Sequence, residues 1–366
     1  LYIIFTGKKF YFIGQQFPDG SDEETVSGLF KKKKVGKIVT STPADGFAPN
    51  FYDPTEGIRF FSNLFFVYLE IYIKQKVDRF LPGVSVSLGG ERFDIQCLIG
   101  KGAFAKVYKC VSEDQEVYAI KFEIPACRWE VYICEILRIR LRPKLLPAVM
   151  TIRDAYIFAN SSAIVYEYHP HGNLLVRIFY FSSKNIFKNF LIFPARILEA
   201  VHAARIIHSD IKPDNFMIIR SIEDILREDN IILKLIDWGR GIDMDLLNNK
   251  IFQGKAGTTD FDCFEMKEGR PWTYQTDFYC FAGTLHVLIF GQYMKCTKGP
   301  TGRYMIIKDL KRRWNHRAVL QDIFDICLNI PDCESFPKWS VLIEGLTEII
   351  RQQWKEVVRD FNMCIA

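Results

Sequence analysis

The chain has 366 residues, of which 49% are hydrophobic and 25% are charged. This composition is close to the average of globular proteins, so it excludes disorder throughout and allows a large core that divides into lobes or domains. The net charge of +5 favours acidic partners or polyphosphate ligands, but the excess is too small to indicate direct nucleic-acid binding. The most apolar stretches, residues 60–73 and 278–290, are too short to span a bilayer, so no membrane contact is predicted.

Ten cysteines are spread along the chain without a CxxC pair or the Cys/His spacing of a zinc site. We therefore expect reduced thiols, which indicate the cytoplasm or the nucleus. The N-terminus lacks the charged start and the small-residue cleavage site of a signal peptide, and no targeting prediction follows from it.

The first 90 residues are interpreted as an N-terminal extension. Residues 1–50 alternate β-prone pieces with Gly, Asp and Ser clusters, and they include a lysine run at residues 31–34. A solvated loop is favoured for this run over a nuclear-import or phosphate-binding patch. Residues 51–82 are predicted to contain one helix that ends before Leu81 and Pro82.

From residue 91 the pattern predicts a small antiparallel lobe with one main helix, which extends to residue 168. Strands are predicted over residues 93–99, 107–111, 117–122, 149–158 and 163–168, and the helix over residues 128–141. The sequence His169-Pro-His-Gly172 then breaks the chain, and helical periodicity dominates residues 169–366. The expected fold class is therefore α+β with two lobes.

Two short motifs contain the residues that phosphoryl transfer needs. HSDIKPDN occupies residues 208–215, and DWG occupies residues 237–239. In such a centre Asp210 would orient the attacking hydroxyl and accept its proton, and Lys212 would offset the charge on the transferred group. Asn215 and Asp237 would supply the oxygen ligands of magnesium. These motifs predict ATP and Mg²⁺ as cofactors.

A glycine-rich turn and a strand lysine form the expected nucleotide site. The segment GKGAFAKV at residues 100–107 places Gly100 and Gly102 between two strands, where backbone groups could close over phosphates. Lys121 ends the third strand in the position of the VAIK lysine, where it would contact the α- and β-phosphates. Val107 and Ala119 are expected to cover the adenine, and Ile99 is included in this site.

Lys121 needs a carboxylate partner, and Glu123, Glu130 and Glu135 compete for this role. Glu123 lies on the strand, two residues past the lysine, so it is not a helix residue. Glu130 shares one stripe of the predicted helix with Cys134, Leu137 and Leu141, whereas Glu135 lies about 140° away. We therefore predict that Glu130 pairs with Lys121 and that Glu135 faces solvent with Arg138 and Arg142.

Downstream, residues 257–265 read GTTDFDCFE and resemble the GTxxYxAPE stretch of serine/threonine kinases. Thr258 would then bridge Asp210 and Lys212. Asp277, at the start of the following apolar helix, would anchor the backbone of the catalytic loop.

Several irregular segments, read together, narrow the resemblance. They are IGKGAFAKVY, RWEVYI, HSD in place of HRD, CFE in place of APE, PWTYQTDFYCFAGT, FGQYMK and LNIPDC. This combination resembles the mitotic checkpoint serine/threonine kinases of the BUB family, including the BUB-related paralogue, from about residue 50 to the end of the chain. The resemblance implies a two-lobed eukaryotic protein kinase fold with the N-terminal extension packed on the small lobe.

The resemblance also implies a cellular role in the spindle assembly checkpoint. Protein substrates are then expected at kinetochores, and the expected localisation is the nucleus, the kinetochore or centromere, and the cytoplasm. In this family the segment that binds a WD-repeat propeller partner lies upstream of the kinase domain, so the chain is interpreted as a C-terminal fragment.

By the same resemblance, further residues are assigned to the adenine pocket. Tyr166 would limit the depth of the pocket at the entry to the hinge, and Glu167 and His169 would offer backbone groups to the base. Met217 would form the floor.

Two departures inside the motifs predict a largely preformed active conformation. Ser209 replaces the arginine that in many kinases pairs with an activation-loop phosphate, so regulation by that ion pair is not expected. Trp238 replaces the usual Phe or Leu after the magnesium aspartate and should wedge between the lobes. A pseudokinase scaffold remains the alternative function, and a small-molecule phosphotransferase is disfavoured by Lys212 and Thr258.

Overall fold

The computed structural model of the chain describes residues 80–102, 104–176, 191–220, 231–255, 261–310 and 316–351. It also gives the backbone of two N-terminal strands, β1 (Tyr2–Thr6) and β2 (Lys9–Ile13). The predicted helix within residues 51–82 and the lysine run at residues 31–34 lie outside the described residues. Among the helices that are described, none is long and apolar enough to cross a membrane.

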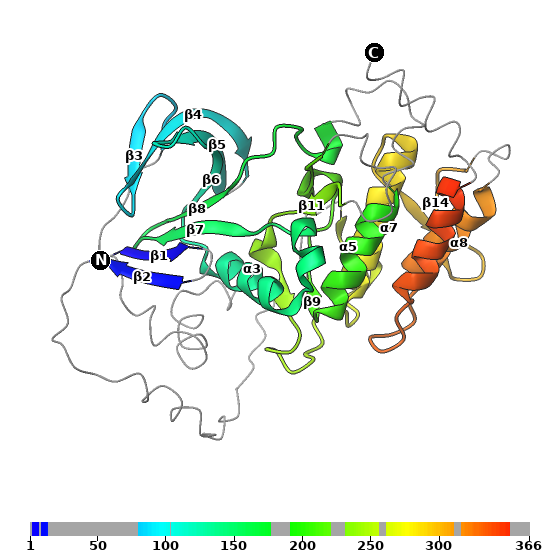
Figure 1. The fold of residues 1–366 in the computed structure, drawn as a ribbon. Helices are drawn as coiled ribbons and strands as arrows, with labels where there is room; N and C mark the ends of the chain where they lie inside the picture. The colour runs from blue at the N-terminus through cyan, green and yellow to red at the C-terminus, as the bar shows by residue number, and fades with distance from the viewer. Residues whose placement is uncertain are drawn as a thin grey trace, which may run out of the picture.

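The small lobe is one antiparallel sheet of six strands in the order β3-β4-β5-β6-β8-β7 (Figure 1). The strands are β3 (Ser85–Leu88), β4 (Glu91–Lys101), β5 (Ala105–Ser112), β6 (Val117–Glu123), β7 (Ile152–Ile157) and β8 (Ser162–Glu167). Five of them confirm predicted strands. The short 3₁₀ helix η3 (Pro143–Ala148) precedes β7.

The two faces of β6 and β8 pack into different hydrophobic cores, because side chains alternate along a strand. Ile120, Phe122, Ala163 and Val165 pack into a core inside the curled sheet. Their neighbours Ala119, Ile164 and Tyr166 belong to a second, larger core that continues into the rest of the molecule. By the same alternation Lys121 lies on this second face, toward the helix of the lobe.

The sheet begins earlier than the predicted limit at residue 91. Strand β3 pairs along its whole length with β4, and Phe80 is buried ahead of it. The Phe80 ring stacks on Phe122 with centroids 4.4 Å apart, and the Phe80 carbonyl accepts a hydrogen bond from the Tyr108 hydroxyl at 2.8 Å. Residues 80–88 are therefore integral to the sheet, although the sequence placed them in the extension.

The first two strands form a separate hairpin at the edge of this sheet. Strands β1 and β2 are antiparallel, with Tyr2 opposite Ile13. Strand β1 lies beside β7, which is an edge strand of the six-stranded sheet (Figure 1). An edge strand has unpaired backbone groups, so a covering segment protects it.

The main helix of the small lobe is α3 (Arg128–Arg140), within one residue of the predicted helix. Its buried residues include Trp129, Glu130, Ile133, Cys134 and Leu137. Glu130 lies in its first turn and is buried, as expected for the inward stripe of the predicted helix. The helix packs on the sheet and on a short 3₁₀ helix of the large lobe, η7 (Trp238–Arg240).

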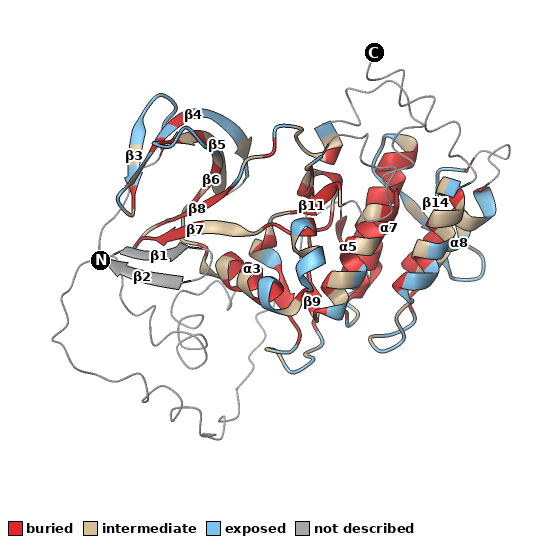
Figure 2. Ribbon diagram, viewed as in Figure 1, coloured by how far each residue is buried: buried red, intermediate tan, exposed pale blue. Residues whose placement is uncertain are grey.

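The large lobe is built around a helix that is buried on all sides, α7 (Gln275–Phe290), which Figure 2 shows almost entirely as buried. It begins two residues before Asp277, where the apolar helix was predicted to start. The other described helices are α5 (Ile192–Ala203), α6 (Phe264–Glu268), α8 (Arg317–Leu328) and the 3₁₀ turn η5 (Pro213–Asn215). Residues 339–351 are also helical.

Short strand pairs hold the loops of the large lobe. They are β9 (Ile206–Ile207) with β12 (Ile242–Asp243), β10 (Phe216–Ile218) with β11 (Leu233–Leu235), and β13 (Cys296–Lys298) with β14 (Tyr304–Ile306). The first two pairs flank the HSDIKPDN and DWG motifs. They therefore bring residues 208–215 and 237–239 to the same place beneath the sheet.

Candidate active site

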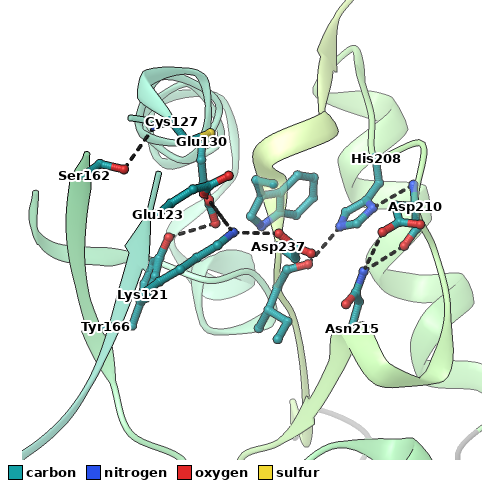
Figure 3. Close-up of polar contacts among 12 residues, drawn as sticks. Lys121, Glu123, Cys127, Glu130, Ser162, Tyr166, His208, Asp210, Asn215 and Asp237 are labelled. Carbon is teal, nitrogen blue, oxygen red and sulfur yellow. Dashed lines mark hydrogen bonds and ion pairs between the residues drawn. The ribbon is translucent and has the colours of Figure 1, made fainter. Parts of the chain in front are cut away.

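The strand lysine lies at the centre of a partly buried ionic cluster (Figure 3). Lys121 Nζ on β6 lies 2.6 Å from Glu130 Oε2 on α3 and 2.8 Å from Asp237 Oδ1 in the DWG motif. Glu135 instead forms an ion pair with Arg138 on the outer side of the helix. Helical spacing therefore selected the glutamate that the structure places at Lys121.

The charges of this cluster fix one another. Burial opposes the charge on Lys121, but Glu130 and Asp237 outweigh that effect and hold the pKa of Lys121 well above its ordinary value. Burial likewise opposes the charge of Asp237, and Lys121 overcomes it and lowers the pKa of this carboxyl to about 2. Asp237 is therefore ionised at neutral pH, as a cation ligand must be.

Glu123 is the weaker neighbour. Its Oε2 lies 3.9 Å from Lys121 Nζ and is buried without a hydrogen-bond partner in the described part of the chain. Burial raises the pKa of Glu123 to about 7. Glu123, Cys127 and Glu130 come close enough together to surround a metal ion. Lys121 already neutralises Glu130, and burial raises the pKa of Cys127, so this group does not have the chemistry of a metal site.

The HSDIKPDN motif forms a compact loop around Asp210. Lys212 Nζ donates a hydrogen bond to Asp210 Oδ2 at 2.7 Å, and Asn215 Nδ2 donates to the Asp210 carbonyl at 2.8 Å. The turn η5 places Asn215 at the start of β10, which pairs with β11 on the way to Asp237. The structure thus brings together the four residues that the motifs singled out.

The backbone of this loop is anchored by Asp277 at the start of α7. Its carboxylate accepts hydrogen bonds from the amides of His208 and Ser209, both at 2.8 Å, and its Oδ2 lies 3.0 Å from His202 Nε2. Ser209 has a positive φ of 60°, and its hydroxyl donates to the Arg240 carbonyl at 2.6 Å. The residue that stands where arginine is usual therefore ties the loop to the segment after DWG.

Near the end of β8, Tyr166 contacts the glutamate that pairs with Lys121. Its side chain is fully buried, and its hydroxyl donates a hydrogen bond to Glu130 Oε1 at 2.8 Å. Both oxygens of Glu130 are thus occupied, one by Lys121 and one by Tyr166. Sequence reasoning missed this contact because nothing in the strand indicates where the hydroxyl ends.

Three titratable side chains, Lys234, Glu167 and His169, lie close together where β8 ends. Lys234 on β11 donates to Glu167 Oε2 at 3.0 Å, and His169 Nε2 lies 3.8 Å from the same oxygen. Burial, assisted by the charge of Lys234, lowers the pKa of His169 to about 4. The sequence analysis overlooked Lys234, although a lysine between Leu233 and Leu235 in a buried strand is a detectable signal for a fixed ion pair.

The residues expected around the base come from strands on both sides of this segment. Ile99 and Gly100 are on β4, Val107 on β5, and Ala119 on β6. A Cβ added to Gly100 would lie 3.4 Å from Val107 Cβ, and the Gly102 amide donates to the Ala105 carbonyl at 2.8 Å to close the turn. Met217 lies on β10, directly opposite Lys234 on β11.

Comparison with known proteins agrees with this arrangement. Residues 93–356 match the protein kinase domain family. The chain belongs to the protein kinase family. Within it, the chain is 43% identical over 293 residues to the mitotic checkpoint serine/threonine-protein kinase bub-1 of Caenorhabditis elegans, covering 75% of this chain and 30% of the relative. It is 34% identical over 287 residues to mouse BUB1, covering 74% and 27% respectively.

The crystal structure of the BubR1 kinase domain matches with a TM-score of 0.76 and 30% identity, over 83% of this chain and 95% of that structure. The two-lobed kinase fold and the resemblance to BUB checkpoint kinases are thereby confirmed. The chain spans less than a third of the length of the two curated relatives.

The oxygen donors of this kinase domain fit Mg²⁺, which protein kinases use together with ATP. Asn215 uses its amide nitrogen toward Asp210, which leaves the amide oxygen to bind a cation together with the ionised Asp237. When bound, magnesium would neutralise the charge of the phosphates, and Lys121 would contact the α- and β-phosphates.

The end of the kinase activation segment is only partly described. Thr258 lies outside the described residues, so its expected contact with Asp210 and Lys212 stays a prediction. After it, Glu265 of the CFE sequence is buried and lies 3.4 Å from Arg270 Nη2. Cys263, which stands near the position of the usual alanine, is also fully buried.

Proposed function

We propose that this domain is an ATP- and magnesium-dependent serine/threonine protein kinase of the spindle assembly checkpoint. The observation that carries the proposal is the ion pair of Lys121 with Glu130 at 2.6 Å, beside Asp237 at 2.8 Å. A kinase requires this pair and the metal-binding aspartate to be in place together. A domain that does not transfer phosphate would not need these three residues in this geometry.

In this mechanism each residue has a limited task. Asp210 orients the hydroxyl of the protein substrate and accepts its proton, while Lys212, at 2.7 Å from Asp210, offsets charge on the transferred phosphoryl group. Lys121 holds the phosphates of ATP, and Asn215 and Asp237 hold magnesium. Catalysis then consists mainly of positioning and electrostatic stabilisation.

The names of the relatives, both mitotic checkpoint kinases, support the cellular setting that we propose. Substrates of the domain are protein hydroxyl groups at kinetochores, and the domain works in the nucleus and cytoplasm of dividing cells. A WD-repeat partner would bind a segment upstream of the kinase domain. The alternative, a pseudokinase scaffold that stabilises a larger checkpoint protein, predicts no phosphate transfer.

The test is transfer of labelled phosphate from ATP to the domain itself and to dephosphorylated casein. Asp210→Asn should lower the transfer rate by about 100-fold or more, because the proton acceptor is lost. Circular dichroism and a thermal melt must show that the variant is folded. Transfer that persists in Asp210→Asn contradicts the catalytic assignment, and no transfer by the wild type would favour the scaffold.

A further inference from the structure

Asp243 is a buried carboxylate that the site described so far does not use. It lies in β12, six residues after Asp237, and its exposed fraction is 0%. Arg140 at the end of α3 donates two hydrogen bonds to it, from Nη1 to Oδ1 and from Nη2 to Oδ2, both at 2.9 Å. The Tyr132 hydroxyl donates to Oδ2 at 2.7 Å. A buried carboxylate with a bidentate arginine and a tyrosine is a strong, directional contact.

One side of α3 makes these contacts. Trp129, Tyr132, Ile133 and Arg140 recur at i, i+3, i+4 and i+11, which places them on the same face of a helix. Trp129 Nε1 donates to the Gly241 carbonyl at 2.6 Å. A Cβ at Gly241 would come within 2.9 Å of Ile133 Cγ2, so glycine is what lets the segment approach the helix this closely.

The same short segment also holds the catalytic loop. Ile242 and Asp243 pair with Ile207 and Ile206 in β9, immediately before His208. The Arg240 carbonyl accepts the hydroxyl of Ser209, next to Asp210. Residues 240–243 therefore connect α3, which carries Glu130, with the loop that carries Asp210.

We propose that Asp243 is a positioning residue: by binding Arg140 and Tyr132 it keeps α3 where Glu130 reaches Lys121, with no phosphate on the activation segment. In many kinases a phosphate on this segment pairs with arginine and orders it. Here a carboxylate within the segment and an arginine on α3 form the pair without modification. The inference rests on the proposed kinase function and adds the residue that would hold its active geometry in place.

The kinetic test uses protein that has been treated with phosphatase. Wild type should retain its activity on casein. Asp243→Asn should lower kcat/KM for ATP at least tenfold and raise KM for ATP severalfold, because Glu130 no longer aligns Lys121. Tyr132→Phe should act in the same direction by about two- to fivefold.

Tyr156→Phe is the matched control, since Tyr156 packs in the core on the opposite face of the sheet, and it should stay within twofold of wild type. Loss of wild-type activity after phosphatase treatment overturns the proposal. So does a variant whose kcat falls while KM for ATP stays unchanged, because that pattern reports only a smaller folded fraction.

A second measurement does not depend on catalysis. Cys127 and Cys134 lie just before and within α3 and are 7% and 4% exposed, whereas Cys280 lies within α7 at 1%. Under native conditions iodoacetamide should modify Cys127 and Cys134 at least tenfold faster in Asp243→Asn than in wild type, with Cys280 unchanged as the internal reference. Equal rates overturn the proposal.

The kinetic and thiol-modification measurements also separate the proposed kinase function from the proposed role of Asp243. If wild type transfers no phosphate, the proposed function fails, and the thiol rates still decide whether Asp243 holds α3. If Asp243→Asn does not fold, Tyr132→Phe decides by the same two measurements, because it removes only one hydroxyl.

Discussion

At the scale of single residues, Lys234, Glu167 and His169 form a group that holds one ion pair and, beside it, one buried histidine ring. Lys234 is 4% exposed, yet its ammonium group is balanced by Glu167. His169 Nε2 is buried beside the same pair and has no hydrogen-bond partner among the described residues. Burial opposes a proton on His169, and that proton would also place a second positive charge beside Lys234, so the low pKa keeps the ring neutral at pH 7.

This arrangement predicts that stability depends on pH through His169. Its folded-state pKa of about 4 lies below the ordinary value of 6.5, so the unfolded chain binds more protons at mildly acidic pH. The stability that a neutral His169 contributes is complete above about pH 6.5 and is lost as the pH falls toward 4. Between pH 7.5 and 5.5 wild type should lose about 1–2 kcal/mol more unfolding free energy than His169→Gln.

Urea denaturation at the two pH values measures this difference. His171→Gln is the control, because it removes the neighbouring histidine of the same segment and should leave the pH dependence in place. An identical loss in wild type and in His169→Gln would show that His169 already has an ordinary pKa.

The same residues mark how far the sequence could predict the site. Lys121, Glu130, Asp210, Asn215 and Asp237 were predictable because motif spacing and helical periodicity are local properties. The contact of Tyr166 with Glu130 joins positions 36 residues apart, and that of Arg140 with Asp243 joins positions 103 apart. Such contacts depend on where packed elements end, which no local pattern records.

At the scale of elements, the buried helix α7 contains several polar side chains. Among them, Asp277 binds the backbone of the catalytic loop. Its carboxylate accepts hydrogen bonds from two backbone amides and lies beside His202 Nε2. The indole Nε1 of Trp339, in the helix at residues 339–351, donates to His202 Nδ1 at 2.9 Å, which leaves Nε2 as the nitrogen that donates to Asp277. The catalytic loop and α5 thus meet the charge on α7 directly, and the helix at residues 339–351 supports it through His202.

Asp277→Asn should therefore be costly although it changes few atoms. The amide nitrogen would face a backbone amide, so one buried donor would be left unpaired. We expect a loss of about 2–4 kcal/mol in unfolding free energy and slower phosphate transfer. Asp325→Asn on α8 makes the same chemical change at an exposed pair with Arg303 and should cost less than about 1 kcal/mol. Equal losses for the two variants would contradict the anchoring role.

Element boundaries show a second limit of local patterns. The helix at 128–140 was predicted within one residue because its apolar stripe is long and Pro125 and Pro143 bound it. Strand β3 has four residues and lies at the edge of the sheet, and its identity depends on pairing with β4. It was therefore assigned to the extension. Phe80 shows the same effect, since it packs in a core with Phe122, 42 positions away.

At the scale of the whole molecule, the two lobes share one hydrophobic core, and charged and polar contacts join them as well. Lys121 meets Asp237, and α3 meets the segment at residues 240–243. The position of the small lobe therefore depends on α3 and on the sheet behind it. Any segment that steadies the sheet also steadies the active site, and the β1–β2 hairpin lies beside the edge strand β7.

Removal of the extension up to residue 79 tests this dependence. We expect a lower melting temperature and weaker phosphate transfer, because β7 loses its neighbour while Phe80 remains. A deletion that continues through residue 80 should cost about 3 kcal/mol more, since it also removes a buried aromatic ring that stacks on Phe122. Differential scanning calorimetry compares the two truncations directly. If removal up to residue 79 changes neither melting temperature nor activity, the extension does not brace the kinase domain. Equal stability of the two truncations would instead exclude a role of Phe80 in the sheet.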